Sequence, residues 1–343
     1  LYTAWSPMLG WALGTVCSGL VTYRLARFRP APPAGVVLDR EQAPDLFGLI
    51  DDTAEHYGRI DVDRLVLTGG YQLDIIKTPC TALPAVSSRS LMIGLPLMQC
   101  LSSQQLVCLL ARRLGQFSKR SNPLLNWLFE LRDIWPLYRS QGAGADPVLL
   151  PVHLLFSVYA PLYTVFSTAA ARLDELRADS YAMEVCSDDE VLEAITTDAV
   201  NRLFLREKYW PVIRKLGAQE AAVITKTNAG MMTVLRAGLQ DGRTGEWIEK
   251  AMCMDQQWND PDPLLVRRLD NIGHVHARLN TRVSETAADD YLPAPVRDLK
   301  DALERVPSAD GPQVQPWSQR IASLVRKLQS SLHDLHAREV KPG

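Results

Sequence analysis

The first hydrophobic block of the chain, residues 5–23, contains no charged residue, and three arginines follow it before residue 30. A helix of about 20 residues crosses the hydrocarbon core of a bilayer, and basic residues gather at its cytoplasmic end. The pattern therefore predicts a transmembrane helix with a basic flank over residues 1–29, with the soluble body on the cytoplasmic side. An uncleaved signal segment or a core helix is the alternative. The Pro-rich residues 30–38 predict a stiff linker between membrane and body.

Beyond this linker, the spacing of apolar residues changes between helical and strand-like periods. Apolar positions recur every three to four residues over 39–57, which predicts an amphipathic helix with an acidic outer face. Short apolar runs at 64–68, 72–78 and 90–94 predict three strands of a small antiparallel or mixed sheet. The next segment, 105–118, is largely apolar on all sides and predicts a central buried helix.

Two further apolar segments lie at 122–138 and 147–171. The second contains 25 residues without Asp, Glu, Lys or Arg, enough to cross a bilayer, whereas three charged residues make the first a poor span. If residues 112 and 175 share a site, a single crossing is excluded, because it would separate them by about 30 Å. We therefore expect a helical hairpin over 122–171 that packs on the body or dips into the membrane surface. Two full spans are the alternative.

Helical spacing continues from residue 172 to about 254, and a turn rich in Asp and Pro at 259–263 precedes another short helix. The last part of the chain, 301–343, combines a polar loop with a terminal amphipathic helix. The whole pattern predicts a mainly α fold with a small β-sheet, an α+β domain over 39–300, behind an N-terminal transmembrane helix.

Composition narrows the class of protein. A chain of 343 residues with 47% hydrophobic and 22% charged residues is expected to fold. Its net charge of −2 gives no electrostatic reason to expect a nucleic-acid partner. The six cysteines are scattered without CxxC spacing, so we expect buried thiols in a reducing compartment rather than disulfides or a metal cluster. The chain begins with Leu1, and we expect its natural start to lie upstream.

The predicted central helix contains an unusual polar group, Arg112, Arg113 and Gln116. The spacing matches the zinc-binding pattern HExxH, in which two histidines four residues apart bind the metal and the glutamate activates its water. Arginine and glutamine replace both histidines and the glutamate here. An arginine stays protonated at physiological pH and has no lone pair to donate, so these residues cannot bind zinc in the usual way.

The order of several segments resembles the membrane-associated zinc metallopeptidases that include the CAAX prenyl protease and HtpX, metallopeptidase family forty-eight. Residues 110–116, with the sequence LARRLGQ, are similar to the family's LAHELGH. Residues 172–182 resemble its RxxExxADxxA signature, and residues 262–269 resemble its HPxxxxRL segment. Residues 90–102 resemble the strand and lead-in before the motif helix. The resemblance covers roughly residues 39–300.

The resemblance implies a role for each matching position. The two zinc-binding histidines correspond to Arg112 and Gln116, and the general base corresponds to Arg113. The third zinc ligand corresponds to Glu175, and the acid that supports a ligand histidine corresponds to Asp179. Only these last two positions keep the residue type of the family.

Two further positions depart from the family. Its later histidine corresponds to Asp262, and its Asn-Ala pair on the strand that receives substrate corresponds to Gln72 and Leu73. The loss of two imidazoles removes most of the zinc-binding energy, and the loss of the base removes the step that activates water. We therefore expect no intact catalytic residue, no bound metal and no cofactor.

The replacements also indicate what takes the place of the metal. Zinc neutralises a carboxylate in such a site, and a carboxylate without a partner in a low-dielectric interior costs free energy. We expect arginine–carboxylate pairs there, formed by Arg112 and Arg113 with Glu175, Asp179 and Asp262. For Arg113 the alternative is a side chain that extends into solvent.

Together these features predict a membrane-anchored pseudopeptidase that acts as a binding, scaffold or regulatory subunit of a membrane complex. Its expected partners are the membrane and a protein, such as an active paralogue. The alternative is a zinc-dependent membrane metalloendopeptidase with an altered site, whose missing ligands come from His153, His274 or a partner chain. His333 and His336 fit a solvated helix face better than a metal site.

Overall fold

The chain was analysed as a computed structural model, which describes residues 2–27, 35–79, 87–118, 150–215, 231–279 and 285–294, with short gaps at 59, 61, 233, 236–237, 239–243 and 258–259. This part is mainly helical and contains a small mixed sheet, as the sequence predicts. Three predicted features lie outside the described residues: the apolar segment 122–138, the C-terminal region 301–343, and the pair His333 and His336.

Four strands form one sheet in the order β1-β2-β4-β3, namely β1 (Val36–Leu38), β2 (Arg64–Thr68), β4 (Ser87–Gly94) and β3 (Leu73–Pro79). The β2–β4 pair is parallel, and the β1–β2 and β3–β4 pairs are antiparallel. The linker prediction for 30–38 is wrong at its end, because residues 36–38 pair with β2 and bury Leu38. On the opposite edge of the sheet, strand β3 contacts the buried helix that comes after β4 in the chain.

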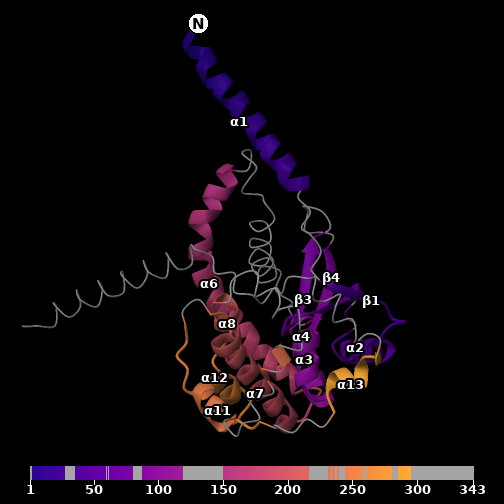
Figure 1. The fold of residues 1–343 in the computed structure, drawn as a ribbon. Helices are drawn as coiled ribbons and strands as arrows, with labels where there is room; N and C mark the ends of the chain where they lie inside the picture. Colours follow the sequence, from indigo (N-terminus) through magenta and orange to yellow (C-terminus); the bar gives the residue numbers. More distant parts are fainter. Residues whose placement is uncertain are drawn as a thin grey trace, which may run out of the picture.

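That helix, α4 (Ser103–Ser118), lies between the sheet and a layer formed by α6 (Leu150–Ala182) and α7 (Asp188–Phe204) (Figure 1). Most of its residues are buried, so the prediction of a central helix is confirmed. Helix α2 (Pro44–His56) covers α4 beside the sheet, within the range predicted as amphipathic. The remaining elements are α3 (Leu95–Cys100), the π-helical turn η3 (Leu205–Tyr209), α8 (Trp210–Lys215), α11 (Thr244–Met252), α12 (Leu265–Asn271) and α13 (Ala287–Tyr291).

Helix α6 is one continuous helix of 33 residues, which includes the point near residue 171 where the predicted apolar segment ends. The change from apolar to charged sequence reflects a change of surroundings along the helix. Phe166 is 78% exposed, whereas Ala178 and Asp179 are fully buried against the body. The apolar first part therefore continues directly into the part that brings its acidic residues to α4.

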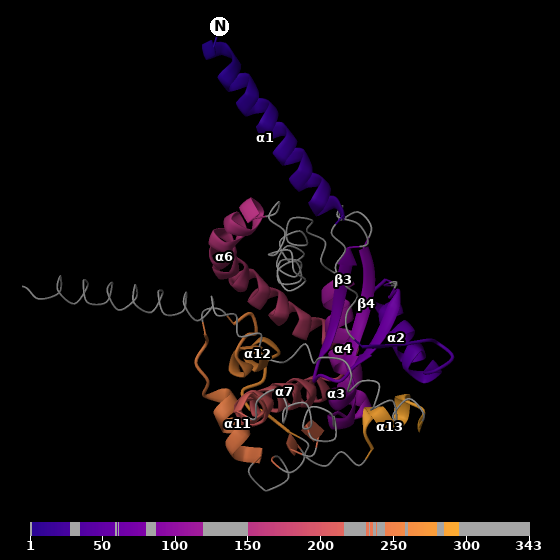
Figure 2. The same ribbon diagram turned by 45° about the horizontal axis from the view of Figure 1, so that its top comes forward.

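Helix α1 (Tyr2–Arg27) covers the block for which the sequence predicts a transmembrane span. It extends away from the body at the end from which the first part of α6 also projects (Figures 1 and 2). Within the described ranges, no helix has both the length and the apolar content that a bilayer crossing needs.

The close approach of α4 and α6 depends on Gly115. A Cβ atom placed at Gly115 would lie 2.6 Å from Cβ of Tyr181, a separation that side chains essentially never show. We predict that Gly115→Ala lowers the free energy of unfolding by about 1–3 kcal/mol, because overpacking outweighs the helix propensity of alanine.

Gly48 on α2 provides a matched control, because a Cβ atom there would have no neighbour within 4 Å. Gly48→Ala is expected to stabilise the protein by up to about 1 kcal/mol. Urea unfolding of both variants measures the two effects. If Gly115→Ala unfolds at the same urea concentration as the original chain, the two helices are not packed this closely.

Candidate functional site

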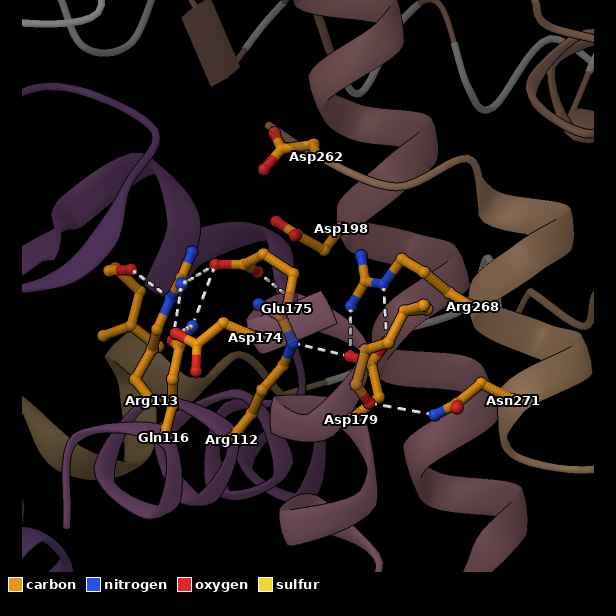
Figure 3. Close-up of polar contacts among 12 residues, drawn as sticks. Arg112, Arg113, Gln116, Asp174, Glu175, Asp179, Asp198, Asp262, Arg268 and Asn271 are labelled. Atoms are coloured by element: carbon orange, nitrogen blue, oxygen red, sulfur yellow. Dashed lines mark hydrogen bonds and ion pairs between the residues drawn. The ribbon is translucent and has the colours of Figure 1, made fainter. Parts of the chain in front are cut away.

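Polar side chains of α4 and acidic side chains of α6 point toward one another in the interior (Figure 3). The two helices run antiparallel, since Gln116 contacts Glu175 while Arg112, one turn earlier, contacts Asp179, one turn later. The structure thus brings five of the six predicted site residues into one group. With Arg268 from α12, we call this group the arginine–carboxylate cluster; its members are Arg112, Arg113, Gln116, Glu175, Asp179 and Arg268.

Arg112 joins the two acidic residues of the cluster. Its Nε donates to Oδ1 of Asp179 at 2.6 Å, and its Nη2 donates to Oε2 of Glu175. The residue is only 4% exposed, so its guanidinium has little contact with water. The two carboxylates accept the hydrogen bonds that water would otherwise accept. The predicted pairing of Arg112 with both carboxylates is confirmed.

Arg113 also points inward, and the alternative that its side chain extends into solvent is wrong. Its Nη1 donates to Oε1 of Glu175 at 2.8 Å and to Oε1 of Gln116 at 3.0 Å. Its Nε donates to the backbone carbonyl of Leu73 at 3.2 Å, at the first residue of the edge strand β3. One guanidinium therefore connects α4, α6 and the sheet.

Gln116 completes the contact between the two helices. Its amide nitrogen donates to Oδ2 of Asp174 at 2.8 Å and to Oε1 of Glu175 at 3.2 Å. Both oxygens of Glu175 thus accept hydrogen bonds, one from Arg112 and the other from Arg113 and Gln116. The carboxylate is fully engaged by side chains of this chain.

Asp179 is completely buried and binds a second arginine that sequence reasoning missed. Arg268 of α12 donates from Nε to Oδ2 at 2.9 Å and from Nη2 to Oδ1 at 2.7 Å. The pair is bidentate, the geometry in which guanidinium and carboxylate interact most strongly. A signal was present in the sequence, because Arg268 lies three residues after Leu265 and directly before Leu269, on the apolar side of the helix.

The electrostatics of the cluster favour the charged forms of Glu175 and Arg112. Burial by itself raises the pKa of Glu175. The guanidinium groups of Arg112 and Arg113 lower this pKa by a larger amount, so it lies well below the usual value of 4.5. Burial lowers the pKa of Arg112, whereas Glu175 and Asp179 raise it more, so the net shift is upward. Three guanidinium groups face the two carboxylates of Glu175 and Asp179, and the carboxylate charge is thus neutralised without a metal ion.

Asp262 does not take the predicted place in the cluster. It is exposed in the loop before α12, and Figure 3 shows its side chain apart from Arg112 and Arg113. Its hydrogen bonds among the described residues use its backbone. Its N–H donates to Oδ1 of Asp260 at 3.0 Å, and its carbonyl accepts from Nε2 of Gln256 at 3.0 Å. The predicted pairing of Asp262 with Arg112 or Arg113 is wrong, because the loop holds its carboxylate outside the α4–α6 contact.

A cavity of about 530 Å³ opens on the outer side of the cluster. Asp74 of β3, Arg113, Asp262 and the π-helical turn η3 are among its walls. Sequence reasoning also missed an ion pair of α7 in this cavity, in which Nε of Arg202 donates to both carboxylate oxygens of Asp198 at 2.9 and 3.0 Å. The spacing of these two residues, four apart on one helix, was the available signal.

The side chains of the cluster do not fit a zinc ion. Zinc needs three lone-pair donors and an open position, whereas Arg112 and Arg113 are donors of hydrogen bonds only and bind both oxygens of Glu175. Among the described side chains, no group of three His, Cys, Asp or Glu residues is placed to hold a metal ion. His274 lies in the turn after α12, and the side chain of His153 is outside the described set.

Three comparisons with known proteins address the identity of the chain. No family model, no curated protein and no solved structure matches it. The resemblance to a peptidase family therefore rests on the motifs quoted above and on the contact of Arg112 with Glu175 and Asp179.

Proposed function

We propose that this chain is a membrane-anchored, catalytically inactive member of the metallopeptidase group that it resembles, and that it acts as a binding, scaffold or regulatory subunit of a membrane complex. One observation supports this most directly. The guanidinium of Arg112, at the position of the first zinc ligand, binds Glu175 and Asp179, the two acids that the resemblance retains. The positive charge of Arg112 thus takes the place of the zinc ion that the family binds at this position.

The charge balance supports a fold that needs no zinc. A buried carboxylate without a partner costs several kcal/mol, which a zinc ion offsets in an active peptidase. Here Arg112 and Arg113 neutralise Glu175, while Arg268 and Arg112 neutralise Asp179. The same substitutions that remove the metal ligands therefore supply the charge that stabilises the remaining acids.

The position of Arg113 also opposes a peptidase reaction. In the family, the general base occupies this position, and a guanidinium accepts no proton from water. Its Nε donates a hydrogen bond to the backbone carbonyl of Leu73 on edge strand β3. An extended peptide would need this carbonyl in order to pair with that edge. Both the activation of water and the alignment of a peptide are thus disfavoured by one residue.

The cavity supports a binding role. Arg206, in its wall, has a single hydrogen bond among the described residues, from Nη2 to the sulfur of Met254 at 3.3 Å. Within the described part of the chain its other guanidinium donors have no hydrogen-bond partner, and acidic or carbonyl groups of a partner would suit them. Trp210 and Leu264 add apolar surface to the same cavity.

Membrane attachment is supported by the uncharged block of α1 and by exposed apolar residues on α6. Tyr159, Val165 and Phe166 are each about half exposed or more, and they lie on the part of α6 that projects from the body. Large exposed apolar side chains near one another indicate an interaction surface. In fractionated cells the full chain should remain in the membrane pellet after alkaline carbonate washing, and its recovery in the soluble fraction would argue against anchoring.

Catalytic inactivity is tested with the purified full chain in mild detergent and an unfolded protein such as casein as substrate. We expect no cleavage, with or without added zinc, and no change of the melting temperature on addition of a zinc chelator. Glu175→Gln is the control, since it removes the one surviving ligand position. Cleavage that the chelator abolishes, and that Glu175→Gln abolishes while the protein stays folded, would establish the zinc-dependent alternative instead.

A further inference from the structure

The cavity beside the arginine–carboxylate cluster contains charged groups that the structure does not use. Four arginines of its wall form ion pairs with carboxylates of the chain, namely Arg112, Arg113, Arg202 and Arg268. Within the described residues, three acids of the same wall form none: Asp74 of β3, Asp260 and Asp262. Arg206 is the one arginine of the wall that also lacks an ion pair among these residues. The charged groups left to a ligand are therefore mostly acidic.

Asp260 and Asp262 lie close together in the loop before α12. The N–H of Asp262 donates to Oδ1 of Asp260 at 3.0 Å, and Nε of Arg172 on α6 donates to the backbone carbonyl of Asp260 at 2.9 Å. These hydrogen bonds hold the loop in the wall of the cavity. Burial and the nearby charge of Asp262 raise the pKa of Asp260, so the two carboxylates repel each other. A cation bound between them would offset this repulsion.

The rest of the wall suits a long basic side chain. The cavity measures about 530 Å³, within the range of roughly 300–1,000 Å³ that ligand sites have. Trp210 and Leu264 add apolar surface, and the face of a tryptophan ring attracts a cation. Lysine and arginine combine an apolar stem with a charged tip, which matches this combination of surfaces.

We propose that this cavity binds a lysine or arginine side chain from a segment of a partner protein, and that Asp260 and Asp262 bind its charged tip. Arg206 donates to a backbone carbonyl of the same segment, an acceptor that a free polyamine does not have. The carbonyl of Leu73 already accepts from Arg113, so the segment is recognised by its basic side chain and not by pairing with β3 at that residue. This binding preference rests on the proposed function and adds the chemistry of the partner.

The test is isothermal titration calorimetry of the full chain in mild detergent with the blocked pentapeptide acetyl-Ala-Leu-Arg-Leu-Ala-amide. The matched peptide has citrulline in place of arginine, which keeps the shape of the side chain and removes its charge. We expect the arginine peptide to bind at least about tenfold more tightly than the citrulline peptide. Binding of spermidine but not of the arginine peptide would indicate a site for small cations and overturn the proposal.

Two double variants locate the preference. D260N/D262N should weaken binding of the arginine peptide by about fivefold or more and leave the citrulline peptide unaffected. Asparagine keeps an Oδ1 acceptor for the N–H of residue 262, so the loop is expected to stay in place. D45N/D52N removes the same charge from exposed positions of α2 outside the cavity wall, and should change binding by less than about twofold.

Three results would overturn the proposal. They are no heat of binding with about 1 mM arginine peptide, equal affinity for the citrulline peptide, and an equal loss of affinity in the two double variants. Mass spectrometry of the peptide after titration separates this proposal from the proposed function. A peptide that is bound and cleaved contradicts catalytic inactivity but supports the charge preference, whereas an intact peptide that does not bind overturns the charge preference alone.

Discussion

Replacement of Arg112 by methionine is expected to lower the free energy of unfolding by about 3–5 kcal/mol, the largest loss for any single member of the cluster. The residue is 4% exposed and its guanidinium contacts both Glu175 and Asp179. Methionine keeps much of the volume but leaves Oε2 of Glu175 without its donor and leaves Asp179 with Arg268 as its one remaining guanidinium partner among the described residues. Urea unfolding of the full chain in mild detergent, followed by tryptophan fluorescence, measures the loss.

Two controls separate this effect from a general response to the loss of an arginine. Arg113→Met should cost less, because the side chain is 17% exposed and Glu175 keeps its contact with Arg112. Arg206→Met should change stability by less than about 0.5 kcal/mol, since Arg206 is exposed and lacks an ion pair within the described part of the chain.

A double-mutant cycle then tests the pair itself. If Arg112 stabilises the fold through Glu175, the combination of Arg112→Met with Glu175→Gln should cost at least about 1 kcal/mol less than the sum of the single changes. A loss below about 1 kcal/mol for Arg112→Met, or strict additivity in the cycle, would show that the cluster does not hold α4 and α6 together.

Reconstruction of the zinc-binding pattern is expected to have the second large effect. The triple variant R112H/R113E/Q116H places two imidazoles four residues apart on the face of α4 that contacts Glu175. It also frees the Glu175 carboxylate to act as a third ligand, while Arg268 continues to neutralise Asp179. We expect this variant to bind about one zinc ion per chain, with a dissociation constant of roughly 1 μM or lower.

Zinc titration calorimetry and elemental analysis measure this gain. The matched control adds Glu175→Gln to the triple variant, which removes the third ligand and should weaken zinc binding by at least tenfold. Circular dichroism establishes that both variants are folded. A folded triple variant that binds no zinc would show that α4 and α6 do not have the relative geometry of a metallopeptidase site, and would remove the main support for the resemblance.

The sequence was sufficient to predict the centre of the fold. The buried helix α4 followed from apolar spacing, whereas its pairing with Glu175 and Asp179 followed from the resemblance to the metallopeptidase motifs together with the cost of burying charge without a partner. Strand β1 was missed because three residues are too short to show an alternating pattern. The change of composition near residue 171 marks the passage of the continuous helix α6 from an exposed to a buried environment.

The candidate site was predictable only where its residues share a recognisable spacing. Arg268 reaches Asp179 from α12, almost ninety residues downstream. Its place on the apolar side of the helix indicates a buried arginine, but it does not indicate which carboxylate that arginine binds. Asp262 was expected in the cluster because of its position in a motif, yet the hydrogen bonds of its own loop determine where its carboxylate lies. Contacts between distant segments depend on how the helices pack, which hydrophobic periodicity does not specify.

The zinc content of the original chain shows whether guanidinium groups have replaced the metal ion. The full chain is produced in zinc-supplemented medium, purified without chelators and analysed by inductively coupled plasma mass spectrometry beside the R112H/R113E/Q116H variant. If guanidinium groups have replaced the metal, the original chain contains less than about 0.1 zinc per molecule while it remains folded. About one zinc per chain, lost together with the folded state on chelation, would contradict the account.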